Sequence, residues 1–423
     1  MSHILYVPNP TGTGHNMRTL ALAQEIHAHH PDIRQSVLVG SMQTVFTPLF
    51  TAAGMEVIPT GSRPVDSATT EHLHTRIDQE TFIDGFVVPT FLNGSKLIDY
   101  LAYYETISPD LVVSDYNLTA SIAAIIGGYR HVLTTERYDF SLVQVSDQDF
   151  IDAGFDLNAA DIDHARGPVS AIFDWIITHS VLVVTDKPPV DSLDAGTALY
   201  RHLHDGNVHF VGPMIRPLPP RHDPAETRRR LGLGQGPVIV ASVGGMTMLM
   251  DDKTTAIAAF RETFARVRRT HPDTEMVLIG REQLAIDDPG VHEVAYLPDW
   301  MPLLQDCAVL VTAPGWITVT EAAALGVPTI FMLEGPGEYH EIEALRRLTA
   351  IGLPTLDHPD PDQLTPLLTQ ALDGGLASCA AGFAVLAPHG RGTPHAADLI
   401  AATVEPPAWP PVGPQPSSAV TAQ

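Results

Sequence analysis

The sequence is poor in lysine, in cysteine and in positive charge overall. Only three of its 423 residues are lysine, and 24 basic residues stand against 49 acidic ones, which gives a net charge of −25. A surface this acidic repels nucleic-acid phosphates and anionic lipid headgroups, so we expect neither as a partner. Two cysteines, Cys307 and Cys379, are too few for a disulfide framework, and their spacing does not match that of a metal site.

Long apolar runs are also missing. No run reaches the ~20 residues that a membrane-spanning helix needs. The opening residues MSHILYVPNP lack the basic and apolar regions of a signal peptide. We therefore expect a cytoplasmic protein without integral membrane contact. Hydrophobic residues make up 44% of the chain, which is enough for a large buried core, and at ~150 residues per domain the length predicts two to three domains.

Short apolar strands alternate with helical patterns twice along the chain, which predicts an α/β protein with parallel sheets covered by helices on both faces. The strands of the first series are expected at 3–7, 36–39, 56–58, 111–114 and 131–135. Those of the second series are expected at 238–242, 275–279, 294–296, 309–312 and 329–332. In open parallel sheets ligands bind beyond the carboxyl ends of the strands, so two such units facing each other would enclose one cleft.

A proline-rich bridge separates the two series. We predict an N-terminal domain at 1–211, a linker at 212–222 and a C-terminal domain at 223–403. The last residues, 404–423, are rich in proline and serine and are expected to be disordered.

The segment TAPGWITVTEAAALGVPTIFM, at 312–332, carries the strongest chemical pattern. Pro314 and Gly315 form a turn before a helix, and Thr318 and Glu321 lie in its first two turns. A helix N-terminus offers unpaired N–H groups to a diphosphate, and Glu321 is placed to accept the hydroxyls of a ribose. The pattern alone equally fits an ordinary buried loop and helix with Glu321 as a surface charge.

This segment resembles the donor-site signature of GT-B glycosyltransferases, which the inverting natural-product enzymes and the peptidoglycan N-acetylglucosaminyltransferase share. Three further segments, 11–21, 109–127 and 238–245, are similar to the family's first loop and helix, its fourth N-domain strand and its C-domain glycine turn. The resemblance implies a GT-B fold, two tandem Rossmann-like domains facing a cleft. It also implies transfer of a sugar from a UDP- or dTDP-linked donor to a small-molecule hydroxyl, without a cofactor or metal.

The resemblance also assigns roles to individual residues. His15 falls on the family's general base and Asp115 on the aspartate that holds it. A neutral imidazole can take a proton near pH 7, and a carboxylate can fix its tautomer. Donor-binding positions fall on Gly244, Gly245, Leu297, Pro314, Gly315, Trp316, Thr318, Glu321, Glu338, His340 and Glu341. We also predict acceptor contacts at Gly14, Asn117, Glu136 and Asp139, the last two because they belong to an acidic run of the N-terminal half.

Departures from the family pattern leave alternatives open. Ala313 stands where plant-type enzymes carry a phosphate-binding histidine and where retaining enzymes carry their first glutamate, so it argues against the retaining subfamily. One alternative is a peptidoglycan-type N-acetylglucosaminyltransferase, which needs a basic, apolar membrane face that this chain hardly shows. A nucleotide-sugar 2-epimerase would carry paired glutamates where Thr320 and Glu321 stand. A non-catalytic nucleotide-sugar-binding helper would need no base.

One acidic stretch suggests the charge of the acceptor. Residues 136–163 hold eight acids and one basic residue, Arg137. Such a run is usually a solvated surface. The alternative hypothesis is that some of its carboxylates face the cleft and attract a cationic, antibiotic-like acceptor such as an aminocyclitol.

Overall fold

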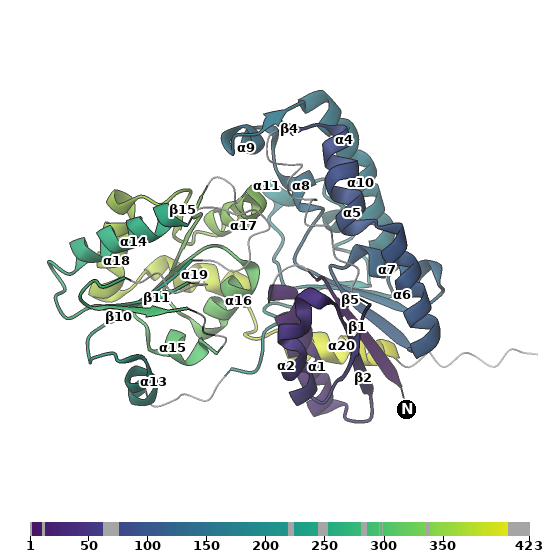
Figure 1. Ribbon diagram of the computed structural model, residues 1–423, viewed down its shortest axis with the longest axis horizontal. Helices are drawn as coiled ribbons and strands as arrows, with labels where there is room; N and C mark the ends of the chain where they lie inside the picture. Colours follow the sequence, from purple (N-terminus) through teal and green to yellow (C-terminus); the bar gives the residue numbers. More distant parts are fainter. Residues whose placement is uncertain are drawn as a thin grey trace, which may run out of the picture.

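The computed structural model consists of two α/β lobes joined by two chain crossings (Figure 1). It describes residues 2–10, 13–61, 76–218, 224–243, 253–280, 286–295, 297, 299–335 and 339–404. The predicted disordered tail beyond residue 404 lies outside this part of the chain. Among the described residues, no helix combines the length and the apolar character needed to cross a membrane.

The N-terminal lobe is built on a parallel sheet of seven strands in the order β3-β2-β1-β5-β6-β8-β9. Its strands are β1 (His3–Pro8), β2 (Arg34–Val39), β3 (Glu56–Pro59), β5 (Leu111–Asp115), β6 (His131–Thr135), β8 (Leu182–Thr185) and β9 (Val208–Phe210). The strands β1, β5, β6 and β8 are buried along their whole length, as expected for parallel strands covered on both faces. A separate small pair joins β4 (Arg76–Ile77) to β7 (Asp156–Leu157).

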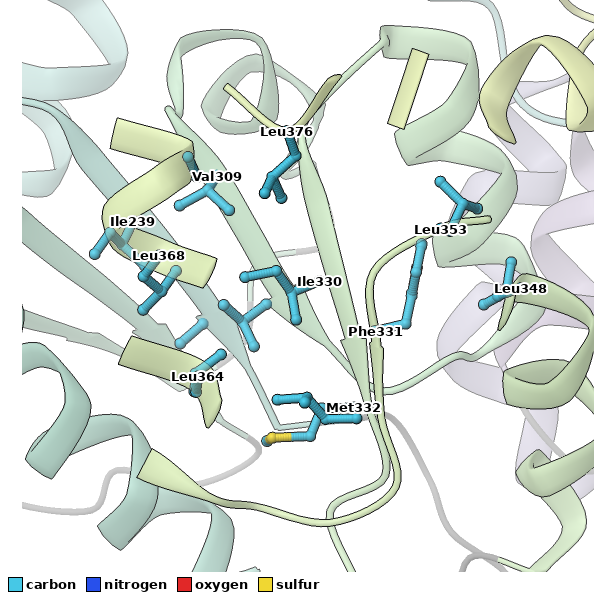
Figure 2. Close-up of a cluster of buried hydrophobic side chains, with 14 of the residues drawn as sticks. Ile239, Val309, Ile330, Phe331, Met332, Leu348, Leu353, Leu364, Leu368 and Leu376 are labelled. Atoms are coloured by element: carbon cyan, nitrogen blue, oxygen red, sulfur yellow. The ribbon is translucent and has the colours of Figure 1, made fainter. Parts of the chain in front are cut away.

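The C-terminal lobe repeats this plan with six parallel strands in the order β12-β11-β10-β13-β14-β15. They are β10 (Val238–Ser242), β11 (Glu275–Ile279), β12 (Val291–Val294), β13 (Val309–Thr312), β14 (Thr329–Met332) and β15 (Thr355–Leu356). Figure 2 shows the core of this lobe, where Ile239, Val309 and Ile330 of adjacent strands meet Leu364 and Leu368 of a covering helix. The predicted α/β architecture with two parallel sheets is confirmed.

Helices cover both sheets. In the N-terminal lobe they are α1 (Thr13–His29), η1 (Ser41–Phe46), α2 (Thr47–Ala52), α4 (Gln79–Phe82), η2 (Ile83–Val87), α5 (Val88–Phe91), α6 (Gly94–Ile107), α7 (Leu118–Ile126), α8 (Ser141–Gln144), α9 (Asp147–Asp152), α10 (Ala159–His179), α11 (Asp191–Asp194) and α12 (Ala198–Arg201). The second half of the chain forms α13 (Pro224–Leu231), α14 (Thr254–Val267), α15 (Met301–Asp306), α16 (Trp316–Leu325), α17 (Tyr339–Ala350), α18 (Pro361–Gly374), α19 (Ala377–Leu386) and α20 (Thr393–Val404).

The last helix returns to the first lobe. In Figure 1 the yellow α20 lies among the purple and blue elements of the N-terminal lobe, against α1. Its residues Ala396, Ala397 and Ile400 are fully buried in the same hydrophobic cluster as Ile4 and Leu20. The sequence predicts that the C-terminal domain extends to residue 403. In the structure, residues 393–404 pack against the N-terminal lobe instead. The apolar face of α20 does not reveal which of two similar sheets it covers.

A buried ion-pair network joins the lobes through α17. Lys187 Nζ of the N-terminal lobe lies 2.6 Å from Glu343 Oε2, and the fully buried Arg347 pairs with Asp194 at 2.5 Å and with Glu343 at 2.6 Å. Burial lowers the pKa of Lys187 to about 8, although Glu343 opposes the change. Burial alone would raise the pKa of Glu343, but Lys187 and Arg347 hold it at about 2. Removing one partner of such a network leaves a buried unpaired charge.

The chain passes between the lobes twice, near Pro213–Ile215 and near Gly392, and these two crossings run side by side. The amide of Gly392 donates to the carbonyl of Pro213 at 2.7 Å, and the hydroxyl of Thr393 donates to the carbonyl of Ile215 at 2.7 Å. A Cβ atom at position 392 would lie 2.1 Å from the carbonyl oxygen of Val211. Only glycine allows this close approach.

We therefore predict that Gly392→Ala lowers the free energy of unfolding by about 1–3 kcal/mol or more, because backbone must shift to admit the methyl group. The matched control is Gly374→Ala, where the added methyl group would meet no atom within 4 Å. Chemical denaturation of both variants measures the difference. Equal stabilities for the two variants would contradict the close approach of the crossings.

Candidate active site

The candidate catalytic residues lie at the carboxyl ends of the central strands of the N-terminal sheet. Asp115 ends β5, and His15 lies in the first turn of α1, which follows β1, the strand paired with β5. Tyr116 follows Asp115 with φ of 44°, a left-handed conformation that is uncommon for a non-glycine residue. Asn9 holds this bend, because its side-chain amide donates to the carbonyl of Tyr116 at 2.9 Å. Such strained backbone is often found where a side chain must be aimed at a site.

The structure brings His15 and Asp115 together as a hydrogen-bonded dyad. His15 Nδ1 lies 2.7 Å from Asp115 Oδ1, and the imidazole ring stacks on Tyr116 with centroids 6.1 Å apart. The buried carboxylate of Asp115 accepts a hydrogen bond from Nδ1–H, which favours the tautomer in which Nε2 carries a lone pair. That arrangement is the one a general base requires.

A third residue, Arg18, completes this cluster and was not predicted from the sequence. Its buried guanidinium forms a bidentate ion pair with Asp115, in which Nε donates to Oδ2 at 2.7 Å and Nη2 donates to Oδ1 at 2.6 Å. It also contacts Glu136 at 2.5 Å and Asp186 at 3.4 Å. Its position three residues after His15 on a helix is the signal that could have indicated it, because residues at that spacing share a helix face.

The charged groups in this cluster shift one another's pKa values. Burial alone would raise the pKa of Glu136, but the cations around it, chiefly Arg18, hold the pKa well below its usual range. Burial raises the pKa of Asp186 to about 6, since Arg18 is more distant there and two other carboxylates are close. The pKa of Arg18 lies well above its usual value because three carboxylates outweigh the effect of burial.

The same residues form a group with the composition of a metal site. Ligand atoms of His15, Asp115 and Glu136 all lie within 4.8 Å of one another. Nη2 of Arg18, however, lies among them, 2.6 Å from Asp115, 2.5 Å from Glu136 and 3.2 Å from His15 Nδ1. A fixed cation of the protein therefore holds the position between these ligands.

The predicted acceptor residues divide into two groups. Glu136 follows β6 and lies beside the dyad, and Gly14 lies in the first turn of α1. Asn117 instead caps α7 by accepting from the amide of Ala120 at 3.2 Å. Asp139 is buried inside the lobe, where it accepts from the hydroxyl of Ser170 and the amide of Ala198. These contacts give Asn117 and Asp139 structural roles, and we do not propose them as acceptor contacts.

The acidic stretch at 136–163 is largely paired within the protein. Asp149 binds Arg346 of α17 across the two lobes, and Asp147 and Asp163 both pair with Arg166 at 2.7 and 2.8 Å. These arginines are distant in the sequence or lie just beyond the stretch. The structure thus gives no support for a broad anionic face toward the cleft.

The helix α16, which carries the predicted donor residues, begins near the dyad. Gly315 precedes it, and its second residue, Ile317, lies against Gly14 of α1, at 3.7 Å from where a Cβ atom of Gly14 would be. The N-termini of α1 and α16 therefore meet, and each carries unpaired N–H groups and a positive dipole end. An anion between them would be stabilised by both helices.

Trp316 adds an unusual feature at this helix start. Its side chain is buried, and within the described part of the chain its indole nitrogen has no hydrogen-bond acceptor. Lys187 of the other lobe lies over the indole ring, 4.4 Å from its centroid. A buried donor without a partner is costly in a folded protein.

Glu321 is buried and already has partners. Its Oε2 accepts from the indole of Trp300 at 2.8 Å, and its Oε1 lies 3.6 Å from Arg216 in the chain crossing. Burial raises the pKa of Glu321, while Trp300 and Arg216 oppose the change. A ribose would have to share these oxygens with Trp300 and Arg216.

The other predicted donor residues are only partly described. Pro314 is buried, while Thr318 and Leu297 are half-buried. Glu341 lies beside Gly315, with Oε1 3.8 Å from where a Cβ atom would be. Gly244, Gly245 and Glu338 lie outside the described residues, as does the side chain of His340.

Comparison with known proteins defines the fold. No family model matches the sequence. Over 178 residues the chain is 26% identical to a processive diacylglycerol beta-glucosyltransferase of Bacillus pumilus, and the match covers 38% of this chain and 41% of that protein. The matched region thus spans less than half of that relative's length.

Solved structures are similar over nearly the whole chain. The glycotransferase of kitacinnamycin has a TM-score of 0.62 at 20% identity, covering 96% of this chain and 99% of its own. An Arabidopsis thaliana protein in complex with UDP has a TM-score of 0.62 at 14% identity, covering 96% and 100%. A UDP-N-acetylglucosamine 2-epimerase from Listeria monocytogenes, described as putative, has a TM-score of 0.57 at 10% identity, covering 94% of each chain. The predicted GT-B fold is confirmed, and because transferases and an epimerase share it, function must be argued from the site.

The charge balance around Arg18 leads to a test of stability. Burial raises the pKa of Asp186 from 3.8 to about 6 in the folded protein. Between these two pH values the unfolded state ionises first, so the free energy of unfolding falls as the pH rises. We expect Asp186→Asn to be as stable as wild type near pH 4 and more stable at pH 7–8, by up to about 3 kcal/mol. Denaturant unfolding across this pH range measures the effect.

The control for this test is Asp152→Asn, which changes an exposed carboxylate. It should show no such divergence from wild type as the pH rises. If Asp186→Asn is less stable than wild type at every pH, then Arg18 requires the ionised carboxylate and the assignment of a raised pKa is wrong.

Proposed function

We propose that the protein is an inverting, metal-independent glycosyltransferase that transfers a sugar from a UDP- or dTDP-linked donor to a hydroxyl of a small molecule. The observation that carries the proposal is the dyad of His15 and Asp115, with 2.7 Å between Nδ1 and Oδ1, facing the N-terminus of a helix with the donor-type sequence. A nucleotide-sugar-binding helper protein would have no use for a base at this place.

In this proposal His15 Nε2 takes the proton of the acceptor hydroxyl as its oxygen attacks the anomeric carbon. The bond from that carbon to the diphosphate breaks, and the diphosphate leaves with its electron pair. Asp115 stabilises the imidazolium that forms, and Arg18 fixes the orientation of Asp115. The two helix N-termini supply donors for the leaving diphosphate.

A single displacement inverts the anomeric centre. Ala313 occupies the position of the first glutamate of retaining enzymes, which supports this stereochemistry. Metal independence is supported by Arg18, whose Nη2 lies among the atoms that would otherwise bind a metal ion. The small-molecule acceptor is proposed from the resemblance of the sequence to natural-product enzymes, and the enzyme of kitacinnamycin shares the fold over 96% of this chain.

The direct test is incubation with a panel of UDP- and dTDP-sugars and measurement of nucleotide diphosphate release. Release that persists in a chelator and rises with an added acceptor supports the proposal. Formation of an epimeric nucleotide sugar would indicate an epimerase instead, and tight binding without turnover would indicate a helper protein.

His15→Ala should lower kcat by roughly 10²–10⁴-fold, the usual contribution of a general base, with little change in donor affinity. Asp115→Asn should cost less, because Asp115 orients the base and does not carry the transferred proton. Steady-state kinetics and donor titration separate the two effects. A His15→Ala variant with wild-type kcat would rule out the assigned base.

Glu321→Ala should weaken binding of nucleoside diphosphate about tenfold or more, because a charge-assisted hydrogen bond to ribose is lost. Trp300→Phe is the matched variant, since it removes only the competing indole donor from Oε2. It should bind nucleoside diphosphate at least as tightly as wild type. If both variants lose only stability and keep the affinity measured by calorimetry, Glu321 is a structural residue.

A further inference from the structure

The second ring nitrogen of His15 faces another carboxylate. Nε2 lies 3.9 Å from Oε1 of Glu136, which follows the strand next to that of Asp115. The imidazole is thus flanked on both sides by acids, Asp115 at Nδ1 and Glu136 at Nε2. A distance of 3.9 Å is too long for a hydrogen bond. Glu136 therefore lies on the side of the ring that a substrate must approach.

Both of these atoms are hydrogen-bond acceptors. The proton of the neutral imidazole is held on Nδ1 by Asp115, which leaves a lone pair on Nε2. Glu136 is ionised, because Arg18 contacts its Oε2 at 2.5 Å and Arg137 Nε lies 3.4 Å from its Oε1. The side chains keep 15% and 8% of their surface exposed, so the pair is reachable but largely shielded from water.

Two acceptors at this separation are complementary to two adjacent donors. One hydroxyl group has a single hydrogen, and in the proposed reaction that hydrogen goes to Nε2. Oε1 of Glu136, which has Arg137 Nε at 3.4 Å, can accept from a second O–H or N–H on the side that faces Nε2. Heteroatoms on adjacent carbons can lie close enough together for one to reach Nε2 and the other to reach Oε1 at ordinary hydrogen-bond lengths, with the two acceptor atoms 3.9 Å apart.

We infer that the acceptor of this enzyme carries a hydroxyl or amino group on the carbon next to the attacking hydroxyl, and that Glu136 binds this neighbouring group. The inference rests on the proposed transferase function. His15 removes the proton of the attacking hydroxyl, while Glu136 takes no part in bond making and acts as a specificity-determining residue. The acceptor class is therefore a vicinal diol or a vicinal amino alcohol.

The test uses three matched model acceptors: vicinal cyclohexanediol, vicinal aminocyclohexanol and cyclohexanol. Each is supplied with the sugar nucleotide that gives the fastest nucleotide diphosphate release. Wild type should use one or both vicinal compounds with kcat/KM about tenfold to hundredfold above cyclohexanol, as expected for a hydrogen bond to a charged group. The ranking of the diol and the amino alcohol identifies which neighbour is preferred.

Glu136→Gln should reduce this preference to near unity by lowering kcat/KM for the vicinal compounds, with a smaller change for cyclohexanol. Because Glu136 also binds Arg18, a second variant, Glu136→Asp, keeps the charge but withdraws it from Nε2 and should weaken the preference as well. The control is Asp147→Asn, which removes a carboxylate of the same stretch that pairs with Arg166 instead. It should keep the wild-type preference, and thermal unfolding checks that all three variants fold.

The outcomes separate the inference from the function on which it rests. Turnover with equal kcat/KM for all three acceptors in wild type, or a preference that survives in a folded Glu136→Gln variant, overturns the inference and leaves the transferase function intact. No nucleotide diphosphate release with any donor and acceptor overturns the proposed function itself, and the inference with it.

Discussion

The guanidinium of Arg18 is the contact on which the arrangement of the N-terminal lobe around His15 depends. It joins α1 to the carboxyl ends of three neighbouring strands, through Asp115 after β5, Glu136 after β6 and Asp186 after β8. The carboxylates of Asp115 and Glu136 are buried and would be costly without this cation, whereas Asp186 makes a longer contact with it. Because one guanidinium contacts all three side chains, it links the positions of these strand ends to that of His15. The geometry of the dyad is a consequence of this shared contact.

The same loop that reaches Arg18 also reaches the other lobe. Asp186 faces Arg18, and its neighbour Lys187 pairs with Glu343 and lies over the ring of Trp316 at the donor helix. Two adjacent residues thus connect the proposed base to the proposed diphosphate site. A buried network of this kind adds less to stability than to uniqueness of arrangement, because any other lobe orientation leaves charges unpaired. The position of the two lobes is set by charge pairing as much as by apolar packing.

Much of the architecture was predictable from the sequence, since alternating strands and helices with buried apolar runs specify parallel sheets. His15 and Asp115 were found because each follows a predicted strand and matches a family position. Arg18 was missed although its spacing from His15 places it on the same helix face, and Asp186 was missed because nothing local shows that this strand end meets a residue of α1. For the same reason the structural roles of Asn117 and Asp139 and the pairing of Asp149 with Arg346 could not be read from composition. An acidic run in the sequence gives the number of carboxylates, whereas the structure decides which arginine each carboxylate pairs with.

The return of α20 to the first lobe has a consequence for how the protein is made. Residues 393–404 fill a place against α1 in the core of the N-terminal lobe, yet they are synthesised after the whole C-terminal lobe. While the ribosome is still translating the second half of the chain, the apolar residues around Ile4 and Leu20 remain uncovered on one side. The lobe of the two that is translated earlier is therefore completed later. Its dyad is built into a core that closes only after α20 has been translated.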